Sequence, residues 1–219
     1  MKPELVLFDL DGTIVQYNHG SFQSSWDALG HAAGLEEEWQ RLMQYYLPRP
    51  ELYQEWCDRN CELLRGLPLA PIAEKIFPPP YTPGFLEFCD YLREQGIWKG
   101  LVSSGVDLVA KKVQQDADLD FIVVNEVHIH DGRFTGTGKI NVGLQEKGAL
   151  IQQILQDYGL LKEGVVFFGD HFNDIPAWQE VGLPLGINVK HESCYPHITR
   201  WFDDFYQARD YFRTEFEGK

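Results

Sequence analysis

The feature that most constrains the fold is a set of short apolar runs, each of which ends in small or acidic polar residues. Near the start of the chain, residues 5–8 (LVLF) run directly into Asp9-Leu-Asp11-Gly12-Thr13. Four consecutive apolar residues are typical of an interior strand of a parallel sheet and are too few to cross a membrane. Because ligands bind beyond the carboxyl ends of such strands, we expect Asp9 and Asp11 to lie at a ligand site.

Two acids one residue apart can divide a phosphoryl transfer between them. A carboxylate can attack phosphorus and form an acyl-phosphate, which we assign as a hypothesis to Asp9. The second acid, Asp11, can protonate the leaving oxygen and later deprotonate the attacking water. Gly12 permits a sharp turn, and the Thr13 hydroxyl could hold that turn or a phosphate oxygen. Taken alone, the motif is also compatible with a solvated strand end.

A second apolar run, expected as a strand over residues 98–102, ends in Ser103 and Ser104. Their hydroxyl and backbone N–H groups could bind phosphate oxygens. Lys147 lies just inside a helix expected to run to about residue 158 and to stop at Gly159. A fixed ammonium at this position could neutralise a phosphoryl group and the carboxylate that attacks it.

A third apolar run, expected as a strand over residues 165–168, leads into Gly-Asp170-His-Phe-Asn173-Asp174. Hard divalent cations prefer carboxylate oxygens, and Mg²⁺ typically takes one or two carboxylates together with waters and a substrate phosphate. The sequence therefore indicates a magnesium site next to the expected phosphate site.

The order of these four motifs resembles that of the haloacid dehalogenase superfamily of phosphohydrolases. The resemblance implies an α/β fold with a Rossmann-like, doubly wound parallel sheet and a small inserted helical cap of the C1 type. It also implies that Asp9 is the nucleophile and that Asp11 is the general acid and base. The phosphate-binding residues would be Thr13, Ser103, Ser104 and Lys147. Mg²⁺ would be held by Asp9, the Asp11 carbonyl, Asp170 and Asp174, and Asn173 would lie near the substrate.

The presence of Asp11 favours phosphomonoester hydrolysis of a small phosphorylated metabolite. The chain looks most similar to phosphoserine phosphatases within the superfamily, yet it departs from their pattern. By spacing, Asn18 stands where they place a glutamate for the substrate ammonium, and Asn60, beside Arg59, stands where they place an arginine for the carboxylate. Ser104 replaces the usual second glycine. The substrate-contacting candidates are Asn18, Arg49, Arg59 and Asn173.

Two alternatives remain open at this point. A phosphomutase would use the same nucleophile and motifs, and would require a bisphosphate activator. A non-catalytic regulatory or interaction protein could retain the fold, although the intact acids argue against it. Phosphate release from one of a panel of phosphorylated compounds would establish the phosphatase, a requirement for a bisphosphate activator would indicate the mutase, and no release across the panel would favour the mutase or the non-catalytic protein.

The periodicity predicts a division into residues 1–14 and 83–219 as the catalytic core and residues 15–82 as a helical cap. In the cap, apolar residues at helical spacing indicate three helices. After residue 83 strands and helices alternate, with a hairpin expected over residues 127–134. The apolar residues of the three cap helices are, in order, Phe22, Trp26 and Leu29; Trp39, Leu42, Met43 and Tyr46; and Leu52, Trp56 and Leu63.

Composition fits an enzyme of a reducing compartment. The formal net charge is −14 across 219 residues, which disfavours partners such as nucleic acid or anionic lipid. The four cysteines form no CxxC pair, and no signal peptide or membrane span is evident, so we expect a cytoplasmic protein. We expect a monomer or a homodimer, with the aromatic C-terminal segment packed on its own domain.

Overall fold

The computed structural model describes residues 2–18 and 23–217, which contain a seven-stranded sheet of order β4-β3-β2-β1-β5-β6-β7. All neighbouring strands pair in parallel except β3 and β4, which are antiparallel. The predicted α/β class with a parallel sheet is therefore confirmed. The strands are β1 (Leu5–Phe8), β2 (Trp98–Val106), β3 (Phe121–His130), β4 (Arg133–Lys139), β5 (Val165–Gly169), β6 (Leu183–Ile187) and β7 (Arg200–Phe202).

The strand order reverses at β1, which lies between β2 and β5. The chain moves outward from β1 through β2 and β3, and then returns to the other side of β1 to continue as β5, β6 and β7. In doubly wound sheets the crevice beyond the carboxyl ends of the strands at such a switch point binds the ligand. The topology therefore places the ends of β1, β2 and β5 around one crevice.

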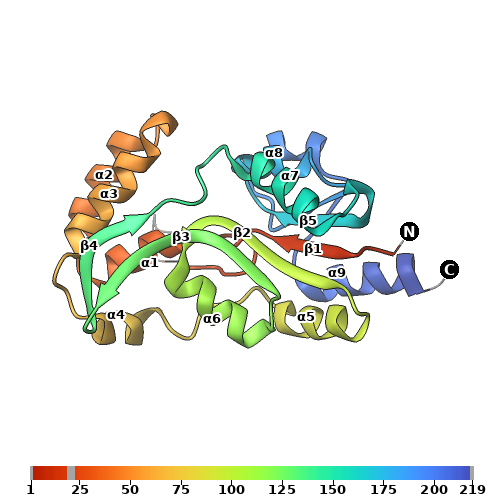
Figure 1. Ribbon diagram of the computed structural model, residues 1–219, viewed down its shortest axis with the longest axis horizontal. Coiled ribbons are helices and arrows are strands. Elements are labelled where there is room, and N and C mark those ends of the chain that lie inside the picture. The colour runs from red at the N-terminus through yellow and green to blue at the C-terminus, as the bar shows by residue number, and fades with distance from the viewer. Residues whose placement is uncertain (1, 19–22, 218–219) are drawn as a thin grey trace.

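Helices cover both faces of the sheet (Figure 1). The alternation of side chains along β1 explains this, because Val6 and Phe8 pack in one apolar cluster and Leu5 and Leu7 in another. The first cluster includes residues of α5 (Phe85–Glu94), α6 (Asp107–Ala117) and α9 (Phe205–Phe212), and the second includes residues of α7 (Lys147–Tyr158) and α8 (Ile175–Trp178). The aromatic C-terminal segment thus packs on its own sheet.

Between β1 and α5 the described residues form four α-helices instead of the three predicted. They are α1 (Ser25–Ala32), α2 (Glu36–Tyr46), α3 (Tyr53–Leu64) and α4 (Leu69–Ile76). Trp26, Leu29 and Trp39 are buried as expected, whereas Phe22 lies outside the described residues. The third predicted helix ends at Gly66, and the sequence pattern predicts no helix between that residue and the prolines at 78–80, so the short helix α4, which follows Pro68, was missed.

The predicted hairpin is longer than expected and joins the helical region to the sheet. β3 continues from the sheet as one strand to His130, and β4 returns against it to Lys139. The loop between α3 and α4 pairs with this hairpin, because Gly66 N–H donates to the Phe134 carbonyl at 2.8 Å and Phe134 N–H donates to the Leu67 carbonyl at 3.0 Å. The segment that contains helices α1 to α4 is thus connected to the core at both of its ends, and it also contacts the hairpin (Figure 1).

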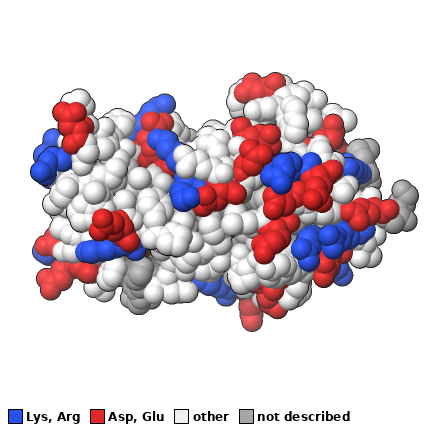
Figure 2. Space-filling view, turned by 90° about the horizontal axis from the view of Figure 1, so that it is seen from below, with Lys and Arg blue, Asp and Glu red and all other residues white. Residues whose placement is uncertain are grey.

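On the face shown in Figure 2, lysine and arginine side chains are interspersed with aspartate and glutamate. No broad basic area gathers on this face. Within the described part of the chain, every helix is too short or too polar to span a bilayer.

The fold predicts that Phe8 is a major source of stability. Its fully buried ring stacks on Phe168 at 5.6 Å and meets Phe85 edge-on at 5.5 Å. We expect Phe8→Ala to lower the free energy of unfolding by about 3–5 kcal/mol in urea denaturation, because it opens a cavity in the core. Leu161→Ala, at a side chain 74% exposed, is the control and should change it by less than about 0.5 kcal/mol. Equal losses in the two variants would contradict this assignment of the core.

Candidate active site

The register of the central strands brings the predicted polar residues together. Phe8 pairs with Leu101 of β2 and with Phe168 of β5, so the residues that follow these three emerge at one edge of the sheet. Asp9 continues the pairing, since its N–H donates to the Phe168 carbonyl at 2.9 Å. Asp9, Ser103 and Asp170, which come from three different strands, consequently line a common cavity.

Lys147 is fully buried beneath this edge. Its Nζ lies 2.5 Å from Asp9 Oδ1 and 2.5 Å from Asp174 Oδ1, and both carboxylates are buried as well. Burial by itself lowers the pKa of a lysine, but the charges of Asp174 and Asp9 outweigh burial and hold the pKa of Lys147 above its ordinary value. The ammonium therefore remains charged and fixes the orientation of Asp9.

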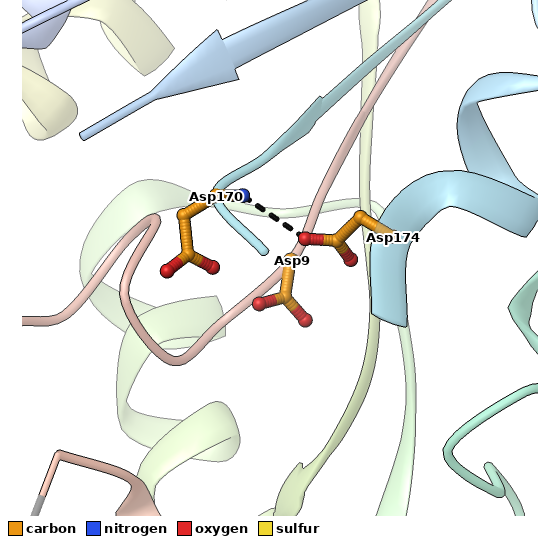
Figure 3. Close-up of side chains that lie close together, drawn as sticks. All are labelled: Asp9, Asp170 and Asp174. Atoms are coloured by element: carbon orange, nitrogen blue, oxygen red, sulfur yellow. Dashed lines mark hydrogen bonds between the residues drawn. The ribbon is translucent and has the colours of Figure 1, made fainter. Parts of the chain in front are cut away.

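Three carboxylates converge beside Lys147 (Figure 3). Oxygen atoms of Asp9, Asp170 and Asp174 all lie within 4.8 Å of one another, and Asp174 Oδ2 accepts the Asp170 N–H at 2.9 Å. Burial raises the pKa of Asp9 to about 6, and burial together with the charge of Asp174 raises that of Asp170 well above its usual range. One ammonium does not balance three buried acids, so this donor set fits a hard divalent cation.

Gly12 makes the close approach of Asp170 possible. Its φ of +86° is in the left-handed region, and a Cβ at this position would lie 2.1 Å from Asp170 Oδ2. Glycine is required here for two separate reasons, the backbone conformation and the space taken by the Asp170 carboxylate.

Asp11 is held by the start of α1. Its Oδ1 accepts the Ser25 N–H at 2.7 Å, and its Oδ2 contacts the Ser25 hydroxyl at 2.8 Å. Free N–H groups of the first helical turn commonly bind carboxylates in this way. Burial, followed by the charge of Asp9, raises the pKa of Asp11 to about 7, so this carboxyl group exchanges its proton near neutral pH.

The irregular end of β2, which contains Ser103 and Ser104, is fixed by the buried Asn125. The amide of this residue donates to the Ser104 carbonyl at 2.8 Å, and its Oδ1 accepts the N–H groups of Asn141 and Val142. The same Ser104 carbonyl accepts from Trp26 Nε1 at 3.0 Å and from the Tyr53 hydroxyl at 2.9 Å. Helices α1 and α3 therefore hold the end of β2 that presents Ser103 and Ser104 to the cavity.

A cavity of about 680 Å³ extends from these groups toward the helical region. Of the predicted site residues, Asp9, Asp11, Ser103, Ser104, Asp170 and Asn173 line it. Thr13 and Lys147 are fully buried and do not line it, so Lys147 acts on Asp9 from behind and the Thr13 hydroxyl lies away from the open space.

The predicted substrate-contacting residues Asn18, Arg49 and Arg59 are exposed and do not line the cavity. Arg49 donates to the Tyr45 carbonyl on the outer surface, and Arg59 lies 3.9 Å from Glu55 on the exposed side of α3. Sequence periodicity located the helices but did not fix which of their faces points inward.

Sequence reasoning also missed Ser25, which positions Asp11. The pattern Ser24-Ser-Trp-Asp27 is a detectable capping box that marks the start of α1. The contact between Ser25 and Asp11 has no local signal, because it depends on how α1 packs against the end of β1.

The geometry predicts a specific cost for a side chain at Gly12. We expect Gly12→Ala to lower the free energy of unfolding by more than Gly34→Ala does. Gly34 has a similar φ of +73° but no atom within 4 Å of the added Cβ, so it isolates the backbone cost of about 1–2 kcal/mol. Thermal and urea unfolding of both variants measure the difference, and equal losses would show that Asp170 moves aside freely.

Comparison with known proteins agrees with this geometry. The chain is 28% identical over 191 residues to a phosphoserine phosphatase of Methanocaldococcus jannaschii, covering 86% of this chain and 87% of the relative. It is 29% identical over 192 residues to one of Archaeoglobus fulgidus, covering 86% of this chain but only 54% of that longer relative.

A solved structure described as a phospho-aspartyl intermediate analogue of phosphoserine phosphatase shares the fold. Its TM-score is 0.78 at 24% identity, and the match covers 96% of this chain and 99% of the other. A family model for haloacid dehalogenase-like hydrolases matches residues 6–179, which include all four motifs. The protein therefore belongs to the haloacid dehalogenase-like hydrolase family.

Proposed function

We propose that this protein is a Mg²⁺-dependent phosphatase that hydrolyses a small phosphorylated metabolite through an aspartyl-phosphate on Asp9. The observation that carries the proposal is the Asp9 carboxylate, which is fixed by Lys147 at the floor of a cavity and has Asp11 two residues away. The similarity to proteins named phosphoserine phosphatases supports the same class of reaction.

In the first step, a carboxylate oxygen of Asp9 attacks phosphorus, and the bond from phosphorus to the substrate oxygen breaks. Asp11 donates its proton to that leaving oxygen, so the product departs as a neutral alcohol. Ser103 and Ser104 line the cavity beside Asp9 and would bind the phosphoryl oxygens. Lys147 holds Asp9 in position and offsets the charge of the attacking group.

In the second step, Asp11 accepts a proton from water, and the water oxygen attacks the phosphorus of the aspartyl-phosphate. The bond between phosphorus and the Asp9 oxygen breaks, which releases inorganic phosphate and restores the carboxylate. Ser25 forms hydrogen bonds with both carboxylate oxygens of Asp11, so the Asp11 carboxyl group is held in place for both proton transfers. A pKa of about 7 suits a group that gives and takes a proton in one cycle.

The residues that would hold Mg²⁺ are Asp9, Asp170 and the Asp11 carbonyl, with Asp174 in support. When bound, the ion would neutralise phosphate charge and polarise the phosphoryl group. We further propose that residues 15–82 act as the cap, since α2 and α3 supply one wall of the cavity. A cap of this kind excludes water other than the attacking molecule and selects the substrate.

The proposed mechanism makes a prediction about the nucleophile. In a screen of phosphorylated metabolites with Mg²⁺, wild-type protein should release phosphate from at least one compound. Asp9→Asn should lower kcat by about 10³-fold or more, because an amide does not form the acyl-phosphate. Circular dichroism and the melting temperature check that the variant is folded. Comparable turnover by the folded variant would contradict the mechanism.

The proposed metal site makes a prediction that is tested by the stability of the protein instead of its activity. Mg²⁺ at about 100 times its Kd should stabilise the wild-type protein by about 2.7 kcal/mol, since it binds only the folded state. Asp170→Asn should lose most of this stabilisation, whereas Asp157→Asn, at an exposed acid on α7, should retain it. An equal Mg²⁺ response in the two variants would place the metal elsewhere.

A further inference from the structure

The far end of the cavity differs in character from the catalytic end. Helices α2 and α3 form its wall with side chains spaced three or four residues apart on one face of each helix. All but one of them are apolar or aromatic. They are Trp39, Met43 and Leu47 at one side, and Tyr53, Trp56, Cys57 and Asn60 at the other.

This wall is held in place by aromatic packing. Trp56 stacks on Tyr46 at 6.2 Å with an interplanar angle of 13°, and Tyr53 meets Trp56 edge-on at 6.2 Å. The hydroxyl of Tyr53 is engaged with the Ser104 carbonyl, so it is not available to a ligand. The cavity volume of about 680 Å³ lies in the range of sites for drug-sized molecules and exceeds the needs of a group as small as serine.

Asn60 is the polar exception in this wall. Its side chain is 3% exposed and lines the cavity, yet its Oδ1 has no hydrogen-bond partner among the described residues. One helical turn before it, the buried Trp56 Nε1 also lacks a partner within the described part of the chain. Because buried polar groups are almost always paired, the unpartnered Asn60 amide in this wall indicates a polar group of a ligand as its partner.

The charges expected of a phosphoserine site are not found on this wall. Asn60 occupies the position where the family resemblance places an arginine, and an amide does not neutralise a carboxylate. None of the described residues lining the cavity is an arginine. Asp27 and Lys190 line the cavity from outside this wall, on α1 and after β6; Asp27 caps α1 by accepting from Ser24, and Lys190 donates to Gln23.

Resting on the function proposed above, we propose that the substrate is a phosphomonoester with a bulky, uncharged, aromatic or apolar organic part. That part carries a hydroxyl or amide group that forms a hydrogen bond with the side-chain amide of Asn60. The phosphate lies at the catalytic end beside Asp9, and the organic part packs against α2 and α3. Asn60 is then a specificity-determining residue and takes no part in the chemical steps.

The test compares esters that all carry phosphate on a primary alcohol. They are phosphoserine, phenylpropyl phosphate and (para-hydroxyphenyl)propyl phosphate, assayed with Mg²⁺ for phosphate release. We expect kcat/KM for both aromatic esters to exceed that for phosphoserine by at least about 10-fold. The phenol should exceed the plain phenyl ester by about 2- to 10-fold, the usual contribution of one hydrogen bond.

Variants at Asn60 test the assigned contact. Asn60→Leu and Asn60→Ala should abolish the preference for the phenol over the phenyl ester, and the ratio is measured within each folded variant. Asp58→Asn, at an exposed residue of the same helix, is the matched control and should leave the ratio unchanged. An unchanged ratio in both Asn60 variants would overturn the role of this residue.

The outcomes separate this inference from the proposed function. Release from para-nitrophenyl phosphate, whose leaving group departs as a stable anion without a proton from Asp11, reports on the Asp9 nucleophile and on hydrolysis of the aspartyl-phosphate. If that compound is hydrolysed and phosphoserine is preferred over both aromatic esters, the substrate class is wrong and the proposed phosphatase stands. If none of these four compounds and none of the screened metabolites is hydrolysed, the proposed function fails together with this inference.

Discussion

The pairing of Lys147 with Asp9 and Asp174 is the interaction on which the rest of the site depends. Removing three charges from water costs several kcal/mol for each ion and is tolerated only where the geometry pairs them closely. The partners come from the start of α7, the end of β1 and the short helix after β5, so the pairing also fixes these elements to one another. Asp170 adds a further buried acid, which leaves the site with an excess of negative charge that a bound cation would offset.

The second constraint is the link between the sheet and the helices above it. The Ser104 carbonyl accepts hydrogen bonds from residues of α1, α3 and β3, so the end of β2 and the far wall of the cavity belong to one network. In the proposed function, chemistry and substrate selection therefore use different parts of the same cavity. The catalytic end is charged and closely paired, whereas the far end is largely apolar and leaves the polar atoms of Asn60 and Trp56 without partners in the described structure.

Much of the fold could be predicted because its signals are local. The apolar run before Asp9 and the acids after β5 indicated the strands and their carboxyl ends. Helix α4 and the full length of the hairpin were missed because their stability depends on the loop between α3 and α4, a contact between distant segments. For the same reason sequence spacing did not show that Arg49 and Arg59 face solvent while Asn60 faces the cavity. The catalytic roles assigned to Asp9 and Asp11 remain predictions.

The measurement that most directly tests the central claim is the identification of the residue that carries the phosphoryl group. Protein mixed with a hydrolysed substrate and Mg²⁺ is quenched in acid within one turnover and treated with borohydride, which reduces an acyl-phosphate to an alcohol. Peptide mass spectrometry then locates the change. The account predicts conversion of Asp9 to homoserine, and no conversion of Asp11, Asp170 or Asp174. Conversion of another residue would contradict the account, as would the absence of any converted residue in protein that was quenched during active turnover.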